Sequence, residues 1–211
     1  MVTRLIWSND RSDSPDVPED RTRSVGHGVT LGLGMRALRA GEQAPRFRLR
    51  DQHGRPVRLS ELLLRGPVIL RFCRHENTAL CIRELNSLSA LHDETRRLGA
   101  TLIVIAVESL NLGPLTDAAA SAHFPILSDK SRKVAQSYGL TYQVSAPKGP
   151  KINDTNGNPK RQREILSAPA TYVIDQTGHV TLAFVDIMRR SLMDHGQILK
   201  ALECFAKRKQ S

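Results

Sequence analysis

Cysteine, aromatic residues and long apolar runs are all scarce in this chain of 211 residues. Its three cysteines, Cys73, Cys81 and Cys204, are too few and too widely spaced for a disulfide scaffold or a paired-cysteine zinc site. No apolar run reaches the length of about 18 residues that a membrane span needs, which excludes an integral membrane protein. An aromatic content of 4% leaves few platforms on which single-stranded nucleic acid could stack.

Positive charge is what the chain has in excess. Lysine and arginine number 31 against 21 acidic residues, which gives a net charge of +10. A basic excess can mark a nucleic-acid partner, but we interpret it here as solvated surface and expect neither a nucleic-acid nor a membrane partner. Unpaired thiols fit a reducing compartment, so the sequence predicts a cytoplasmic protein.

The composition divides the chain near residue 40. Residues 1–40 include a polar, charged and aperiodic stretch that buries too little apolar surface to offset its ordering entropy, so we expect disorder there. Residues 41–211 contain apolar runs and periodic segments typical of one α/β domain, with a central mixed sheet, helices on both faces and an N-terminal β-hairpin.

The expected elements follow from hydrophobic periodicity and turn residues. Apolar alternation around a turn at 51–54 predicts the hairpin, and the loop predicted over 143–167 is rich in proline, glycine and asparagine. The expected strands cover 67–72, 101–107, 124–129, 170–175 and 179–185, and the expected helices cover 60–63, 79–98, 115–122, 130–138 and 192–207.

Cys81 lies where a strand, a short polar loop and a helix start follow one another. The unpaired amides and the dipole at a helix N-terminus stabilise a thiolate, and the nearby Arg74 and Arg83 add positive charge. Both effects lower the pKa of a thiol from its usual value of about 8.5. A plain alternative remains, because Cys81 also continues the apolar stripe of Leu85 and Leu88 and free cysteine is often a core residue.

Several segments together resemble the alkyl hydroperoxide reductase/thiol-specific antioxidant (AhpC/TSA) family, the peroxiredoxins. The family's GxxAPxFxL entry is matched at 41–49, and its active-site pattern PxxxTxxC reads Arg74-xxx-Thr78-xx-Cys81, with Glu84 three residues later. Further matches lie at 59–62, 66–70, 127–129, 171–178 and 183–190. The resemblance covers about four fifths of the chain.

This resemblance implies a thioredoxin-like fold and a thiol peroxidase acting on hydrogen peroxide or alkyl hydroperoxides. Cys81 would be the peroxidatic nucleophile that becomes a sulfenic acid. Thr78 would hydrogen-bond the thiolate and the peroxide, and Pro169 and Glu84 would line the substrate pocket. No cofactor and no metal is implied, and the scattered histidines show no metal-binding spacing.

Position 169 departs from the family. Relatives usually carry an arginine there that contacts the thiolate and the substrate, whereas this chain has Pro169. A proline at this place resembles thioredoxin-like oxidoreductases, so we expect a cis Ala168–Pro169 bond facing the active cysteine. The missing positive charge would come from Arg71, Arg74 or Arg83, and we favour Arg74.

Reduction of the oxidised enzyme needs a second thiol. Some relatives use a C-terminal cysteine, which makes Cys204 a candidate resolving residue, although a thiol on the last helix is the simpler interpretation. Cys73 is expected to be a packing residue. Its closeness to Cys81 in the sequence leaves a resolving role open as an alternative. Otherwise an external thiol, from thioredoxin, glutaredoxin or glutathione, would reduce the enzyme. The resemblance also allows a homodimer.

Two other functions stay open at this point. A thioredoxin-like disulfide oxidoreductase would need a second cooperating thiol for Cys81. A degenerate thioredoxin-fold protein that binds an anionic partner through its basic surface would explain Pro169 and the altered loop.

Overall fold

The computed structural model describes residues 36–73, 78–106, 121–145, 152–153, 159–160, 163–186 and 194–208. In chain order its elements are β1 (Arg48–Arg50), β2 (Pro56–Arg58), α2 (Leu59–Leu63), β3 (Val68–Phe72), α3 (Thr78–Arg97), β4 (Thr101–Ala106), β5 (Ile126–Ser128), α5 (Lys133–Ser137), β6 (Thr141–Ser145), β7 (Ile152–Asn153), β8 (Pro159–Lys160), β9 (Arg163–Ser167), β10 (Ala170–Ile174), β11 (Val180–Val185) and α6 (His195–Arg208).

Seven of these strands form one mixed sheet in the order β11-β10-β3-β4-β5-β1-β2. The central strands β3, β4 and β5 are parallel, and β10, β11, β1 and β2 pair in antiparallel fashion. All five residues of β3 are buried, as expected for a parallel strand covered on both faces. The predicted α/β architecture is confirmed, and so is the N-terminal hairpin, in which Leu49 lies opposite Val57.

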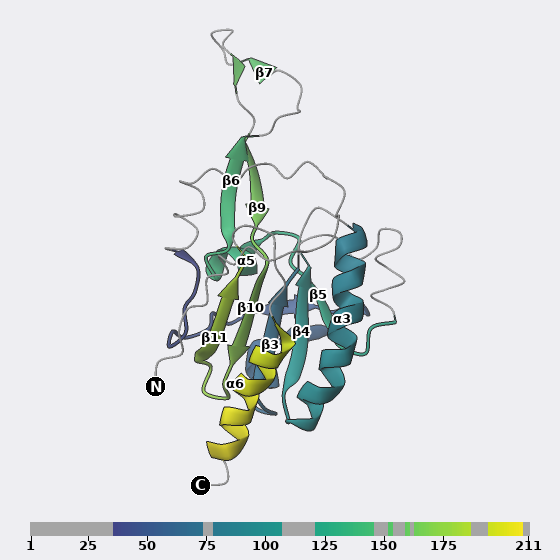
Figure 1. Cartoon of the computed structure of the whole chain (residues 1–211). Helices are drawn as coiled ribbons and strands as arrows, with labels where there is room; N and C mark the ends of the chain where they lie inside the picture. The colour runs from purple at the N-terminus through teal and green to yellow at the C-terminus, as the bar shows by residue number, and fades with distance from the viewer. Residues whose placement is uncertain are drawn as a thin grey trace, which may run out of the picture.

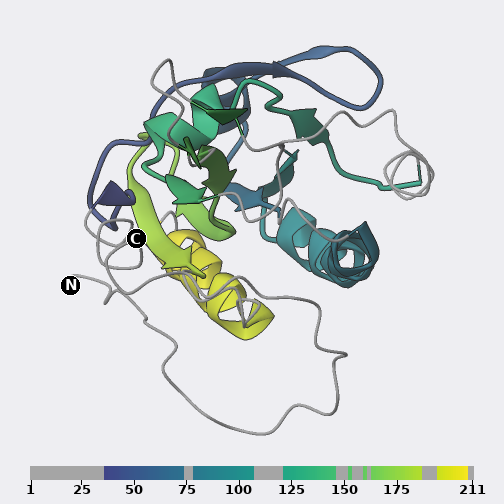
Figure 2. The same ribbon diagram turned by 90° about the horizontal axis from the view of Figure 1, so that it is seen from above.

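Helices cover both faces of the sheet (Figure 1). One core packs α3 and α6 against a sheet face that includes Ile69 and Leu102, and α3 contacts α6 (Figure 2). The other core packs α2 and α5 against the opposite face, where Phe72, Tyr138 and Tyr172 form an aromatic cluster with ring centroids 5.2–6.1 Å apart. Burial raises the pKa of both tyrosines above the usual value of 10, because the charged phenolate would lose its hydration in this core.

The two long helices follow their predicted apolar stripes. On α3, Leu85, Leu88 and Leu91 are each at most 5% exposed. This helix closes with the Ala100 amide donating to the Thr95 carbonyl at 2.9 Å, one residue after Gly99, the predicted stop. On α6, the predicted inward residues Ile198 and Leu202 are buried, and Leu199 and Phe205 pack partly buried beside them.

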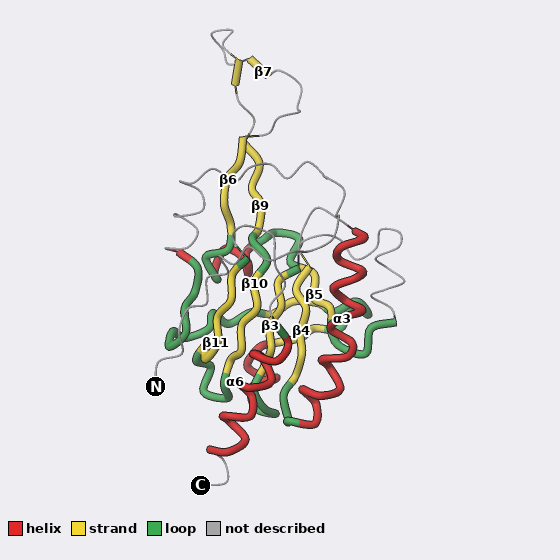
Figure 3. The backbone as a smooth tube through the Cα atoms, viewed as in Figure 1, coloured by secondary structure: helices red, strands yellow, loops and turns green. Residues whose placement is uncertain are grey.

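The predicted loop over 143–167 is wrong as an unstructured segment. β6 and β9 pair antiparallel, with Thr141 opposite Ser167, and a shorter ladder joins β7 to β8 (Figure 3). Breaker residues such as Pro147 and Gly157 lie between these ladder strands, where a hairpin requires turns. Their density hid the short extended segments on either side.

Some expectations lie outside the described residues. These include residues 1–35 of the segment predicted to be disordered, 1–40, and most of the helix predicted over 115–122, of which Ser121 and Ala122 are described and are not helical. Where the described chain begins, Ala37 is already 7% exposed and the Leu38 amide donates to the Tyr138 carbonyl at 3.1 Å. Within the described part of the chain, no helix is both long and apolar enough to cross a membrane.

Candidate active site

Arg71 is the one charged residue of β3, and it faces the layer formed by α3 and α6. Strand side chains alternate between faces, so Arg71 shares its face with Ile69, while Leu70 and Phe72 join the opposite core. The Arg71 side chain is 3% exposed. A guanidinium buried this deeply needs partners for its N–H groups and its charge.

Two neighbouring elements supply those partners. Arg71 Nε donates to Glu84 Oε1 of α3, forming an ion pair in which Glu84 is also 3% exposed. Arg71 Nη1 donates to Thr171 Oγ1 of β10 at 2.7 Å, and the two residues are direct cross-strand partners. Nη2 is buried and has no hydrogen-bond partner among the described residues. The guanidinium therefore joins three elements, and one of its nitrogens has no partner in the part of the chain that the structure describes.

A small cavity adjoins this ion pair. Its volume of about 20 Å³ is enough for a single water molecule. Ser87 of α3 and His195 of α6 close one side, with Ser87 Oγ 3.4 Å from His195 Nε2. The full lining consists of Ile69, Arg71, Glu84, Ser87, Leu88, Thr171, His195 and Ile198.

The predicted nucleophile lies one turn before Glu84. α3 begins at Thr78, so Cys81 is its fourth residue, and the amides of the first four helical residues have no partner within the helix. The structure describes the helical backbone of Thr78 and Cys81 but not their side chains, and Arg74 lies outside the described residues. Arg83 is exposed. Glu84, predicted to line the substrate pocket, is one of the residues that line this small cavity, and it pairs there with Arg71.

The expected cis bond at Pro169 is wrong. No peptide bond among the described residues is cis, so the Ala168–Pro169 bond is trans. β9 leads directly into β10 here (Figure 1), and an extended chain suits the residue before a trans proline. Backbone hydrogen bonds at 2.9 Å hold the junction, from Ala168 to the Leu140 carbonyl and from Asp186 to the Pro169 carbonyl.

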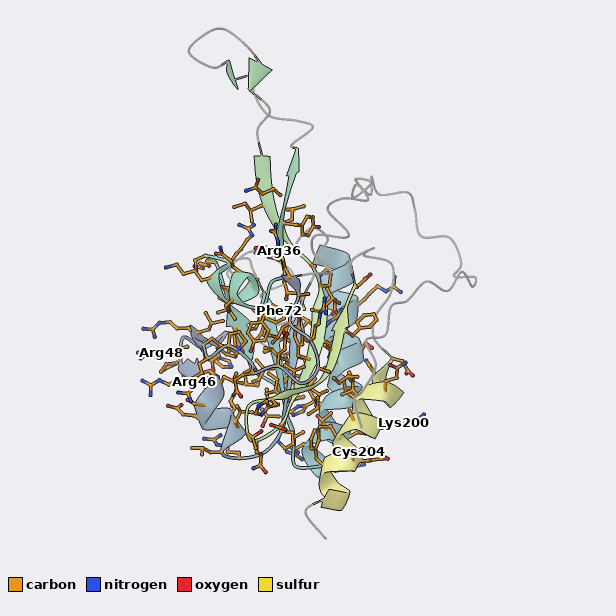
Figure 4. All side chains as sticks on the ribbon, turned by 90° about the vertical axis from the view of Figure 1, so that its left-hand side faces the viewer. Arg36, Arg46, Arg48, Phe72, Lys200 and Cys204 are labelled. Atoms are coloured by element: carbon orange, nitrogen blue, oxygen red, sulfur yellow. The ribbon has the colours of Figure 1, made fainter. Side chains whose placement is uncertain are left out.

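The other two cysteines are placed very differently. Cys73 directly follows β3 and is 5% exposed, which fits the predicted packing role. Cys204 is exposed and lies near the end of α6, at the opposite end of the sheet from the first turn of α3 (Figure 4). His195, the first residue of α6, lies beside Ser87 of α3, and Cys204 follows about 13 Å further along α6. A disulfide needs Cα atoms within about 7 Å of each other. The structure does not bring Cys204 to the start of α3.

Thr171, Ser87 and His195 belong to this site and were not predicted. Their signal in the sequence was indirect: a lone arginine in the apolar run 67–72 needs an acidic partner if it is buried. Among the described residues, no group of three or more histidine, cysteine or acidic side chains is arranged to hold a metal ion.

A family model described as the AhpC/TSA family matches residues 40–183, which include β3, the first turn of α3 and β10. The chain belongs to the AhpC/TSA family. Peroxiredoxin Q of Sedum lineare is 26% identical over 144 residues, which is 68% of this chain and 67% of that protein. A putative peroxiredoxin bcp of Helicobacter pylori is 30% identical over 104 residues, which is 49% of this chain and 68% of that protein.

Solved structures of other proteins have the same fold as this AhpC/TSA chain. Peroxidoxin BcpB from Mycobacterium tuberculosis superposes with a TM-score of 0.60 at 24% identity, covering 78% of this chain and 96% of that one. The thioredoxin-like fold expected from the sequence is thereby confirmed. The matched stretches span 56–67% of the length of the first four plant peroxiredoxin Q relatives, so substrates and partners do not transfer directly.

Proposed function

We propose that this protein is a thiol-dependent peroxidase that reduces hydrogen peroxide or alkyl hydroperoxides through Cys81. The observation that carries the proposal is the position of Cys81, the fourth residue of a helix that follows a buried strand, inside the stretch that matches the AhpC/TSA family. At such a helix start, unpaired amides and the helix dipole favour a thiolate, which is the reactive form of cysteine.

The chemistry has two halves. The Cys81 thiolate attacks the distal peroxide oxygen, the O–O bond breaks, and the leaving oxygen takes a proton to become water or an alcohol. The sulfenic acid on Cys81 then condenses with a second thiol, which forms a disulfide and releases water. In this proposal the Thr78 hydroxyl and an arginine at position 74 hydrogen-bond the reacting oxygens, and the amides of the first helical turn polarise them.

For the second half we propose an external thiol, from thioredoxin, glutaredoxin or glutathione. Cys204 lies at the far end of α6, away from the start of α3, and Cys73 is only 5% exposed, so we propose neither of them as the resolving thiol. A cytoplasmic location fits this dependence on small or protein thiols, and we include it in the proposal.

Trapping of the oxidised cysteine tests the proposal. The reduced protein is treated with stoichiometric hydrogen peroxide and dimedone, and each cysteine peptide is then quantified by mass spectrometry. We expect the dimedone adduct on Cys81 and its absence in Cys81→Ser, while Cys204→Ser, the matched control, keeps it. A Cys81 that reacts no faster than a free thiol would overturn the peroxidase and favour a binding protein of the same fold.

A further inference from the structure

We propose that Arg71 is a positioning residue for Cys81, because its guanidinium pairs with Glu84, fixes the first turns of α3 and keeps the Glu84 carboxylate compensated on the helix face that carries Cys81. This inference rests on the proposed function, since it assigns Arg71 a role toward the same thiol. Its starting point is the buried ion pair between Arg71 and Glu84.

Helix geometry connects the ion pair to Cys81. Residues three apart share one helix face, so Cys81 and Glu84 lie one above the other on α3. Side chains on a helix lean toward its N-terminus, which directs the Glu84 carboxylate over the turn that contains Cys81. Arg71, held against that carboxylate, is brought to the same side of the helix start.

Two side-chain contacts hold Arg71 in one position relative to the first turns of α3. Its Nε and Nη1 atoms contact α3 and β10 through Glu84 and Thr171. β3 leads into the start of α3 after only five intervening residues, 73–77, so the strand end and the helix start are neighbours in the chain. Arginine keeps its charge at every physiological pH, and the contacts of its planar fork fix direction as well as distance.

The third guanidinium nitrogen of Arg71, Nη2, lies next to the small cavity. Arg71 Nη2 is buried, unpartnered among the described residues and adjacent to the cavity of about 20 Å³. Around that cavity, the charged or titratable side chains in the described part of the chain are Arg71 on β3, Glu84 on α3 and His195 on α6, while β10 contributes the neutral Thr171. Arg71 is the one permanent cation in this set.

The pH dependence of Cys81 alkylation by iodoacetamide, followed peptide by peptide, tests the role. Arg71→Met leaves the Glu84 carboxylate uncompensated and is expected to raise the apparent pKa of the Cys81 thiol by about 1 unit.

Glu84→Gln keeps an oxygen for Arg71 Nε but leaves the cation uncompensated, so it is expected to lower that pKa. Arg71→Lys keeps the positive charge beside Glu84, so the upward shift of the Cys81 pKa expected for Arg71→Met should not appear in this variant. Exposed residues at the far end of α3 provide matched controls, Arg96→Met and Glu94→Gln, in which no shift is expected.

Opposite shifts in Arg71→Met and Glu84→Gln support the positioning role, because loosening of the helix alone would move both variants in one direction. Shifts in the same direction, or none, overturn it. If Arg71→Met does not fold, Glu84→Gln decides the matter, and the absence of a downward shift overturns the role. Dimedone trapping in the same samples separates the two proposals: a wild-type protein that forms no sulfenic acid overturns the peroxidase, whereas normal oxidation without opposite shifts overturns only the role of Arg71.

Discussion

Arg71 and Glu84 form an ion pair with each side chain 3% exposed, between the strand that precedes the candidate active site and the helix that contains it. Removing two charges from water is costly, and their attraction offsets that cost only while both partners are present. The pair therefore says little about net stability, but it ties the packing of β3 against α3 to one specific geometry.

Breaking the pair from one side is expected to be severe. Arg71→Met leaves a buried carboxylate without its cation and should lower the free energy of unfolding by about 3–5 kcal/mol, a large part of the 5–15 kcal/mol typical of a domain. The double variant Arg71→Met/Glu84→Met replaces both charges by apolar groups of similar length and should lie within about 1 kcal/mol of wild type. Urea unfolding followed by circular dichroism measures both, and a double variant as unstable as the single one would contradict this account.

The sequence predicted this fold where local patterns are strong, and it missed long-range partners. The buried strand at 68–72 and the helix with Leu85 and Leu88 were predicted within one residue, because apolar runs and helical stripes are local signals. The partners of Arg71 are 13 and 100 residues away, at Glu84 and Thr171. Nothing in the sequence near Arg71 separates an inward guanidinium from an outward one, so that part of the site needed the tertiary structure.

Asp51 is expected to make the hairpin turn sensitive to acid. Its carboxylate accepts hydrogen bonds from the amides of His53 and Arg55 at 2.9 and 2.8 Å and from Arg55 Nε at 3.0 Å. Burial alone would raise the pKa of Asp51, but the hydrogen bonds and charge of Arg55 and the amide of His53 outweigh burial, so its pKa lies below the usual 3.8. A lowered pKa stabilises the folded protein above the unfolded value, and this stabilisation is lost as the pH falls through the folded value.

Asp51→Asn keeps an acceptor oxygen but removes the charge, so we expect a loss of about 1 kcal/mol at pH 7 that becomes smaller as the pH falls below the usual aspartate pKa of 3.8, for example at pH 3. Urea unfolding at both pH values measures the difference. Asp93→Asn, which changes an exposed carboxylate on α3, serves as the control. An Asp51→Asn deficit that stays constant between the two pH values would show that geometry rather than charge carries the effect.

Gly139 ends α5 against the first residues of the described chain. Its φ is +69°, and an added Cβ would come within 2.0 Å of the Arg36 carbonyl oxygen. Gly139→Ala combines left-handed backbone strain with a backbone collision, for an expected loss of about 2–5 kcal/mol. At Gly54 φ is +78° but no atom lies within 4 Å of the added Cβ, so Gly54→Ala should cost only the strain of about 1–2 kcal/mol. Thermal unfolding of the two variants compares them, and equal losses would contradict a collision at Gly139.

Thr171 is expected to matter more than its size suggests. Thr171→Val keeps the β-branched shape on a buried strand but removes the oxygen that accepts from Arg71 Nη1 at 2.7 Å. Because Nη2 is already unpartnered among the described residues, the guanidinium would then keep only its contact with Glu84. A buried donor left unsatisfied costs about 1–3 kcal/mol, so we expect Thr171→Val to lower the free energy of unfolding by that amount.

Thr181→Val on β11 is the control. The Thr181 hydroxyl donates to the Val173 carbonyl at 3.1 Å in a part-buried setting, and its loss leaves no charged group without a partner. If urea unfolding gave the two variants equal losses, the hydroxyl of Thr171 would be an ordinary strand hydrogen bond rather than a support for Arg71.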